Sequence, residues 1–170
     1  MKIFGMVGWR DSGKTTLMEN LLPELIQRGL EVSTIKHTHH GFDIDKPEKD
    51  SYKHRNAGAR EVLVTSSVRW ALMHELHGDP EEAVEAMIAR MEPVDLLLIE
   101  GFKKNEHKKM EIHRPSKGRP LLCQDDPNIV MVASDGPLPE VSLPVLDLGD
   151  TPAIADFIIK YCRLAEGAGN

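Results

Sequence analysis

The stretch Gly8-Trp9-Arg10-Asp11-Ser12-Gly13-Lys14-Thr15 matches the phosphate-binding loop pattern G-x-x-x-x-G-K-[ST] at every defined position. In such loops the two glycines let backbone N–H groups turn inward around phosphates, the lysine reaches the β- and γ-phosphates, and the final hydroxyl ligates Mg²⁺. A helix that begins here adds the positive end of its dipole. The sequence therefore predicts a nucleoside triphosphate site formed by residues 8–16, with Thr16 expected at the α-phosphate.

The sequence on either side of this loop has the required strand and helix patterns. Lys2–Val7 is a short, mostly apolar run typical of a buried parallel strand. Lys14–Gln27 carries leucines at helical spacing and ends before Gly29, with Pro23 expected to kink it. A plain turn between strand and helix is the alternative, but such a turn would not require the Gly-Lys-Thr-Thr ending.

A second nucleotide motif follows about eighty residues later. Asp95–Gly101 contains four consecutive aliphatic residues, an acid and a glycine, which is the form of a Walker B strand. In P-loop folds this strand delivers a carboxylate near Mg²⁺, usually through a water, and the glycine lets the backbone pass the γ-phosphate. We therefore expect Glu100 to ligate Mg²⁺, usually through a water, and Gly101 to contact the nucleotide. Lys14 and Glu100 are the predicted catalytic residues.

Strand patterns alternate with helix patterns along the rest of the chain. Further strands are predicted at residues 31–36, 61–65, 69–74, 110–113, 120–123, 129–136 and 145–148. Helices are predicted before Gly58, from an N-cap at Asp79, and from Thr151. This alternation predicts an α/β fold of three layers, the P-loop NTPase fold, with a mostly parallel central sheet and helices on both faces.

Length and composition indicate one globular domain. The 170 residues are 41% hydrophobic, so we expect a single nucleotide-binding domain over residues 1–164 and a frayed tail over 165–170. No apolar run is long enough to cross a membrane, and the N-terminus lacks the apolar core of a signal peptide, which favours a cytoplasmic protein. Cys123 and Cys162 are isolated, so they are expected to be core thiols.

The charge is uneven along the chain. A formal net charge of −6 argues against nonspecific binding of nucleic acid. Between Lys103 and Arg119, however, seven basic residues stand against two acidic ones, a local balance of +5. This basic segment is either a solvated loop or a surface that binds an anion or docks a partner beside the nucleotide.

Several polar residues outside the two motifs are candidates for ligand contacts. Asp43 and Asp45 suit Mg²⁺ as hard carboxylates, or else cap a turn or helix. The histidines between His37 and His40 either share a structural zinc ion or shape a switch loop. Arg10 either reaches a phosphate, of its own subunit or a neighbour's, or is solvated.

The predicted nucleotide site must also recognise a base. Sites that select guanine usually contain a carboxylate that accepts hydrogen bonds from the base. Asp135 stands at the end of a predicted strand, where parallel sheets bind ligands. It is the first candidate for this role, and Asp125 and Asp126 are its rivals.

Several of these segments together carry a family resemblance over residues 1–135. The segments are the phosphate loop, Ile35-Lys36-His37-Thr38-His39-His40, Asp43-Ile44-Asp45-Lys46-Pro47, Lys49-Asp50-Ser51-Tyr52, Ala57-Gly58-Ala59 and Leu98-Ile99-Glu100-Gly101-Phe102-Lys103. They resemble the molybdopterin-guanine dinucleotide biosynthesis adapter family, MobB. The His-Thr-His-His and Asp-x-Asp-x-Pro segments are the most specific part of the likeness.

The resemblance implies a homodimeric GTP-binding protein with weak GTPase activity that uses Mg²⁺. Such a protein assists the nucleotidyltransferase that attaches GMP to molybdopterin in molybdenum cofactor synthesis. The basic segment would suit an acidic partner or the anionic pterin. The competing hypothesis is an ATP-dependent small-molecule kinase or ligase of cofactor synthesis, and a third is a nucleotide-binding protein without hydrolysis.

Overall fold

A computed structural model describes residues 1–38 and 41–165 of the chain. Its residues form two compact units, each described here by itself: Met1–His37 together with Glu92–Asn170, and Thr38–Met91. The sequence had suggested a single domain over residues 1–164. All but the first residue of the predicted tail lies outside the described residues.

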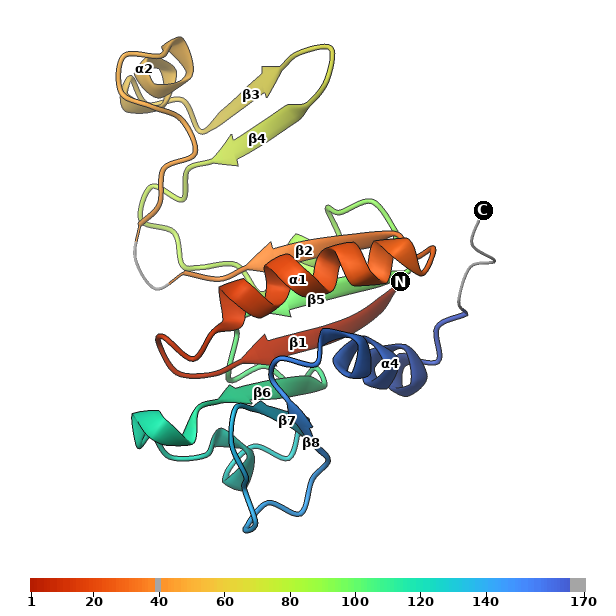
Figure 1. Cartoon of the computed structure of the whole chain (residues 1–170). Coiled ribbons are helices and arrows are strands. Elements are labelled where there is room, and N and C mark those ends of the chain that lie inside the picture. The colour runs from red at the N-terminus through yellow and green to blue at the C-terminus, as the bar shows by residue number, and fades with distance from the viewer. Residues whose placement is uncertain (39–40, 166–170) are drawn as a thin grey trace. The chain divides into compact units, whose positions relative to one another are not determined.

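The first unit is built on a six-stranded sheet in which every pairing is parallel (Figure 1). Its strands, in spatial order, are β2 (Val32–Lys36), β5 (Leu96–Glu100), β1 (Lys2–Val7), β6 (Lys109–His113), β7 (Ile129–Ser134) and β8 (Val145–Asp147). The predicted α/β fold with a parallel sheet is confirmed. β5 and β6 flank β1 and run parallel to it. The carboxyl ends of all three strands therefore lie beside the phosphate loop, which follows β1 in the chain.

Two helices pack on the same face of this sheet, as Figure 1 shows: α1 (Lys14–Gln27) and α4 (Thr151–Cys162). Leu21 of α1 and Ile158 of α4 are fully buried in one apolar cluster with Phe4 and Leu98 of the strands. The Asp150 carboxylate caps α4 by accepting a 3.0 Å hydrogen bond from the backbone N–H of Ala153. The bounds of β1 and α1 are those predicted, and α1 continues through Pro23.

The opposite face of the sheet near β6 is covered by a short 3-10 helix, η2 (Leu122–Gln124). Buried Glu111 of β6 accepts hydrogen bonds from the backbone N–H groups of Leu122 and Cys123, at 3.0 and 2.9 Å. The strand predicted at 120–123 is therefore wrong, since these amides bond a carboxylate instead of a neighbouring strand. A second 3-10 helix, η1 (Pro115–Lys117), follows β6 directly.

The second unit contains the helix α2 (Asp50–Asn56), an antiparallel hairpin of β3 (Glu61–Thr65) and β4 (Trp70–His74), and the short helix α3 (Val84–Ile88). The helix start predicted with Asp79 as its N-cap is wrong, because the N-cap of α3 is Ala83, four residues later. The Asp79 carboxylate accepts a 2.7 Å hydrogen bond from Arg60 and so does not cap a helix.

In the described part of the chain, no helix combines the length and the apolar character needed to span a membrane.

Candidate functional site

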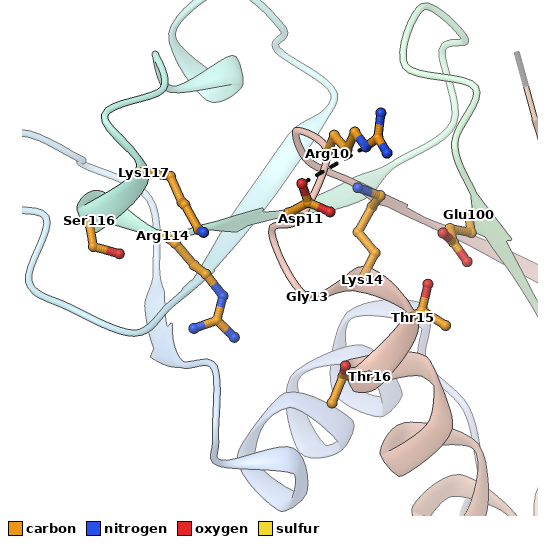
Figure 2. Close-up of a pocket in the computed structure, with 10 residues that line it drawn as sticks. All are labelled: Arg10, Asp11, Gly13, Lys14, Thr15, Thr16, Glu100, Arg114, Ser116 and Lys117. Carbon is orange, nitrogen blue, oxygen red and sulfur yellow. Dashed lines mark ion pairs between the residues drawn. The ribbon is translucent and has the colours of Figure 1, made fainter.

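The phosphate loop borders a cavity of about 670 Å³ in the first unit (Figure 2). The cavity is lined by four cationic and two acidic side chains together with small and hydroxyl residues. They are Arg10, Asp11, Gly13, Lys14, Thr15, Thr16, Glu100, Arg114, Ser116 and Lys117. The structure thus brings Lys14, Thr15, Thr16 and Glu100 together, as the two motifs predict, and the excess of positive charge favours an anionic ligand.

Each of the two loop glycines stands where another residue would be unfavourable. A Cβ on Gly8 would lie 2.5 Å from the carbonyl oxygen of Ile112 and 2.6 Å from the Ser12 hydroxyl oxygen. Gly13 has φ +102°, a left-handed conformation that residues with a Cβ rarely adopt, and it stands at the N-cap of α1. The loop is therefore held close to β6 and turned so that its backbone lines the cavity.

Lys14 lies folded over the loop. Its Nζ donates hydrogen bonds to the carbonyl oxygens of Gly8, at 3.0 Å, and Trp9, at 2.7 Å. Burial lowers the pKa of Lys14, and the Glu100 carboxylate partly opposes this shift. The ammonium is thus partly desolvated, which strengthens its attraction for a phosphate.

Glu100 stands at the carboxyl end of β5 and its side chain is only 12% exposed. One of its carboxylate oxygens lies 3.4 Å from the Nζ of Lys36, the residue paired with Glu100 across β2 and β5. Neither sequence motif predicts a role for Lys36. Lys36 ends a predicted strand, and parallel sheets bind ligands at the carboxyl ends of their strands. This position was the indication in the sequence that Lys36 could belong to the site.

Gly101 turns the chain sharply after Glu100. It has φ +103°, and a Cβ there would lie 2.9 Å from the Cβ of His37. Phe102 follows with φ +47°, and its ring lies 4.4 Å from the His37 ring between centroids. Two consecutive left-handed residues, one of them not glycine, mark this turn as conformationally costly.

The other loop residues differ in their surroundings. Arg10 is almost fully exposed and lies 3.9 Å from the Asp11 carboxylate. Ser12 is buried, with its hydroxyl oxygen 3.5 Å from the Lys14 Nζ. Trp9 donates a 2.8 Å hydrogen bond from Nε1 to the Pro120 carbonyl, and its ring carries the Lys103 ammonium 4.5 Å from the centroid.

Asp135, the first candidate for reading guanine, is bound by an arginine of the cavity wall. Arg114 donates from Nη1 to the Asp135 carboxylate and from Nε to the Ser12 carbonyl at 3.0 Å. Both charged side chains are about one third exposed. The sequence pattern identifies Arg114 only as a member of the basic segment.

The basic segment is divided between different tasks. Lys109 is buried and donates to the Asp126 carboxylate at 2.9 Å and to the carbonyl oxygens of Lys103 and Asn105. Asp126, a rival for guanine, is thereby held by a structural ion pair. Asp125 borders a separate cavity of about 370 Å³.

Two basic residues of this segment, Arg114 and Lys117, line the cavity beside the phosphate loop, which we call the phosphate cavity.

Asp43 and Asp45 lie in the second unit. Both accept hydrogen bonds from Arg55, Asp43 at 2.8 Å and Asp45 at 2.7 and 3.3 Å. The Arg55 guanidinium holds the pKa of Asp45 below its usual range. A role for either carboxylate as a magnesium ligand stays a prediction.

The histidine cluster falls partly outside the described residues, since His39 and His40 are not among them. Within residues 1–38 and 41–165, no three histidine, cysteine, aspartate or glutamate side chains are grouped so that they could hold a metal ion.

Comparison with known proteins establishes the family. Residues 3–135 match the family described as Molybdopterin guanine dinucleotide synthesis protein B, MobB. The chain is 40% identical over 168 residues to the molybdopterin-guanine dinucleotide biosynthesis adapter protein of Escherichia coli strain K12, covering 97% of this chain and 95% of that protein. The chain belongs to the MobB family.

Two further MobB relatives agree with this membership. The Haemophilus influenzae adapter protein of the same name is 39% identical over 166 residues, which cover 98% of this chain and 92% of the relative. The crystal structure of the MobB homolog from Bacillus stearothermophilus superposes with a TM-score of 0.72 at 25% identity, over 97% of this chain and all of that one. The resemblance inferred from the motifs and the P-loop NTPase fold are therefore confirmed.

Proposed function

We propose that this MobB protein is an adapter of molybdopterin-guanine dinucleotide synthesis that binds GTP and Mg²⁺ in the phosphate cavity. The observation that carries the proposal is that Lys14, Thr15 and Glu100 line one cavity beside a loop in which Gly8 has no room for a Cβ and Gly13 is left-handed. The names of the 40% and 39% identical relatives supply the pathway.

The residues present fit both ligands. The loop from Gly8 to Gly13 would wrap the β- and γ-phosphates, and Lys14 would neutralise the charge that develops there. The hydroxyl of Thr15 and the carboxylate of Glu100 are hard oxygen donors of the kind that Mg²⁺ prefers, with Glu100 acting directly or through a water. When bound, Mg²⁺ would polarise the phosphate oxygens. Lys14 and Glu100 are thus our proposed catalytic residues.

Adapter activity implies further properties, which belong to the same proposal. GTP hydrolysis would be slow and would accompany assembly or handover with the nucleotidyltransferase that attaches GMP to molybdopterin. The protein would act as a cytoplasmic homodimer. Molybdopterin itself is a second binding partner to test.

The central test is a nucleotide panel of GTP, GDP and ATP, with and without Mg²⁺, measured by calorimetry on the wild type and on Lys14→Ala. We expect Lys14→Ala to weaken GTP binding about 100-fold, because a charge-assisted contact to phosphate is lost. Lys104→Ala, an exposed lysine that borders the separate cavity, is the matched control and should bind normally. Equal GTP affinity in wild type and Lys14→Ala would overturn the proposal.

Turnover separates the adapter from the competing kinase or ligase. An adapter should hydrolyse GTP slowly, form no phosphorylated metabolite and associate with the nucleotidyltransferase. Acceleration of nucleotide consumption by orders of magnitude on adding one small metabolite would favour the kinase.

Asp135→Asn tests our proposed guanine contact. If Asp135 accepts hydrogen bonds from the base, the variant should lose preference for GTP over ATP. An equal loss of affinity for both nucleotides would contradict this assignment and would indicate that Asp135 acts through Arg114.

A further inference from the structure

Two cationic side chains face the phosphate loop from the other side of the cavity. Arg114 follows β6 directly, and Lys117 ends the short helix η1. Both line the cavity that contains Lys14, and Figure 2 shows them on the side opposite Glu100. Neither belongs to the phosphate-loop or Walker B motif.

Arg114 is fixed at this position by contacts with two neighbours. Its Nε donates to the Ser12 carbonyl at 3.0 Å, and its Nη1 donates to the Asp135 carboxylate. A Cβ on Gly13 would lie 3.1 Å from its Nη2, so the guanidinium lies against the last turn of the loop. The two hydrogen bonds use two of the five N–H donors of a guanidinium, which leaves it capable of binding an oxyanion as well.

Lys117 reaches the same region as an exposed side chain. Its backbone N–H bonds to the carbonyl of Arg114 at 3.0 Å, and Gly118 ends the turn in a left-handed conformation. In the described part of the chain, no carboxylate forms an ion pair with Lys117. Its charge is therefore available to a ligand.

The position of these residues defines which end of a nucleotide they would meet. Glu100, our proposed metal ligand, lies on the opposite side of the cavity from Arg114 and Lys117 (Figure 2). Arg114 lies instead beside Gly13, at the opening of α1 near Thr16, which is the side expected for the α-phosphate. We infer that Arg114 and Lys117 contact the α-phosphate end of the bound nucleotide. The inference rests on the proposed function of the cavity.

The test compares GDP and GTP, since both nucleotides carry the α- and β-phosphates and only GTP carries the γ-phosphate. Affinities of Lys117→Ala, Arg114→Gln and the control Lys104→Ala are measured by calorimetry with each nucleotide at one ionic strength. Lys117→Ala should weaken GDP and GTP by the same factor, about fivefold, because an exposed ammonium contact is screened by solvent. Arg114→Gln should cause a larger but again equal loss, since a fixed guanidinium binds phosphate more strongly.

The outcomes separate this inference from the function on which it rests. A loss confined to GTP would place the contact at the γ-phosphate and overturn the inference. Affinities for Lys117→Ala equal to those of Lys104→Ala would also overturn it, while leaving GTP binding by wild type intact. A wild-type protein that binds neither nucleotide would refute the proposed function itself. Because Lys117 is exposed, its variant stays informative even if Arg114→Gln fails to fold.

Discussion

The two compact units of this MobB protein are stabilised by different interactions. The first unit has a continuous apolar core in which Phe4, Leu21, Leu98 and Ile158 are fully buried between a parallel sheet and two helices. In the described part of the second unit, the buried apolar residues are Val62, Met73 and Val84. Burial of apolar area is the main source of folding free energy, so the first unit is expected to be much the more stable.

In the second unit, an ion-pair cluster and exposed apolar residues take the place of a large core. Arg55 donates to Asp43, Asp45 and Glu75, and the Arg55 and Asp45 side chains are only 13% and 7% exposed. The hairpin meanwhile exposes large apolar side chains, among them Trp70 at 68%. The cavity beside the phosphate loop therefore belongs to the unit with the larger core, whereas the polar segment before α2 belongs to the unit with the smaller core.

The largest effect should come from the core of the first unit. Leu98→Ala removes a fully buried side chain of β5 and should lower the free energy of unfolding by about 3–5 kcal/mol. Leu63→Ala, at an exposed position of the hairpin, is the matched control and should change it by about 0.5 kcal/mol or less. Urea unfolding followed by circular dichroism measures both. Equal destabilisation by the two substitutions would contradict the expected difference in core size between the units.

A smaller and local effect should follow from Arg55→Gln. This change leaves three carboxylates of the second unit without their shared cation, one of them nearly buried, which destabilises the cluster. Backbone amides of α2 and β3 should exchange hydrogen faster, while those of β1 and β5 keep their protection. Lys53→Gln removes only an exposed pair with Asp50 and should have little effect. If protection falls equally in both units, they unfold together and the contrast between them is lost.

Predictions from the sequence succeeded and failed in both units: the strand predicted at 61–65 of the second unit is β3, whereas the strand predicted at 120–123 of the first unit is wrong. Contiguous apolar runs and helical spacing gave β1 and α1 with their observed bounds, since both elements are determined by local pattern. In the second unit, Asp79 had the pattern of a helix N-cap but bonds Arg60, nineteen residues away. The local N-cap pattern fails here because Arg60, which is distant in the sequence, binds the Asp79 carboxylate.

The same distinction applies to the candidate site. Each motif is local, so Lys14, Thr15 and Glu100 could be named from the sequence before the cavity that contains them was known. Lys36 and Arg114 join the region because β2 and β6 lie where they do in the sheet order β2-β5-β1-β6. Strand order depends on long-range pairing, which no local pattern in the chain specifies.

The smallest effect concerns the thiol of Cys123 in the first unit. Its pKa is shifted by a different cause from that of Asp45 in the second unit. Burial, with a further contribution from the Glu111 carboxylate, raises the pKa of Cys123 from its ordinary value of 9.0 to about 11. In the second unit, ion pairing with Arg55 instead lowers the pKa of Asp45. At pH 8 the thiolate fraction of Cys123 should be about 100-fold below that of an ordinary cysteine.

Iodoacetamide labelling followed by mass spectrometry therefore should show Cys123 reacting about 100-fold more slowly than a cysteine peptide at pH 8, with a rate that rises until about pH 11. Since the folded state favours the neutral thiol, its contribution to stability is complete below pH 9.0 and is lost as the pH rises to about 11.

Glu111→Gln removes the neighbouring negative charge, so it should lower the pKa of Cys123 and speed its labelling. Cys162, whose pKa is raised by its own burial, serves as the internal control and should keep its rate in that variant. An unchanged rate at Cys123 would mean that the Glu111 charge does not act on the thiol.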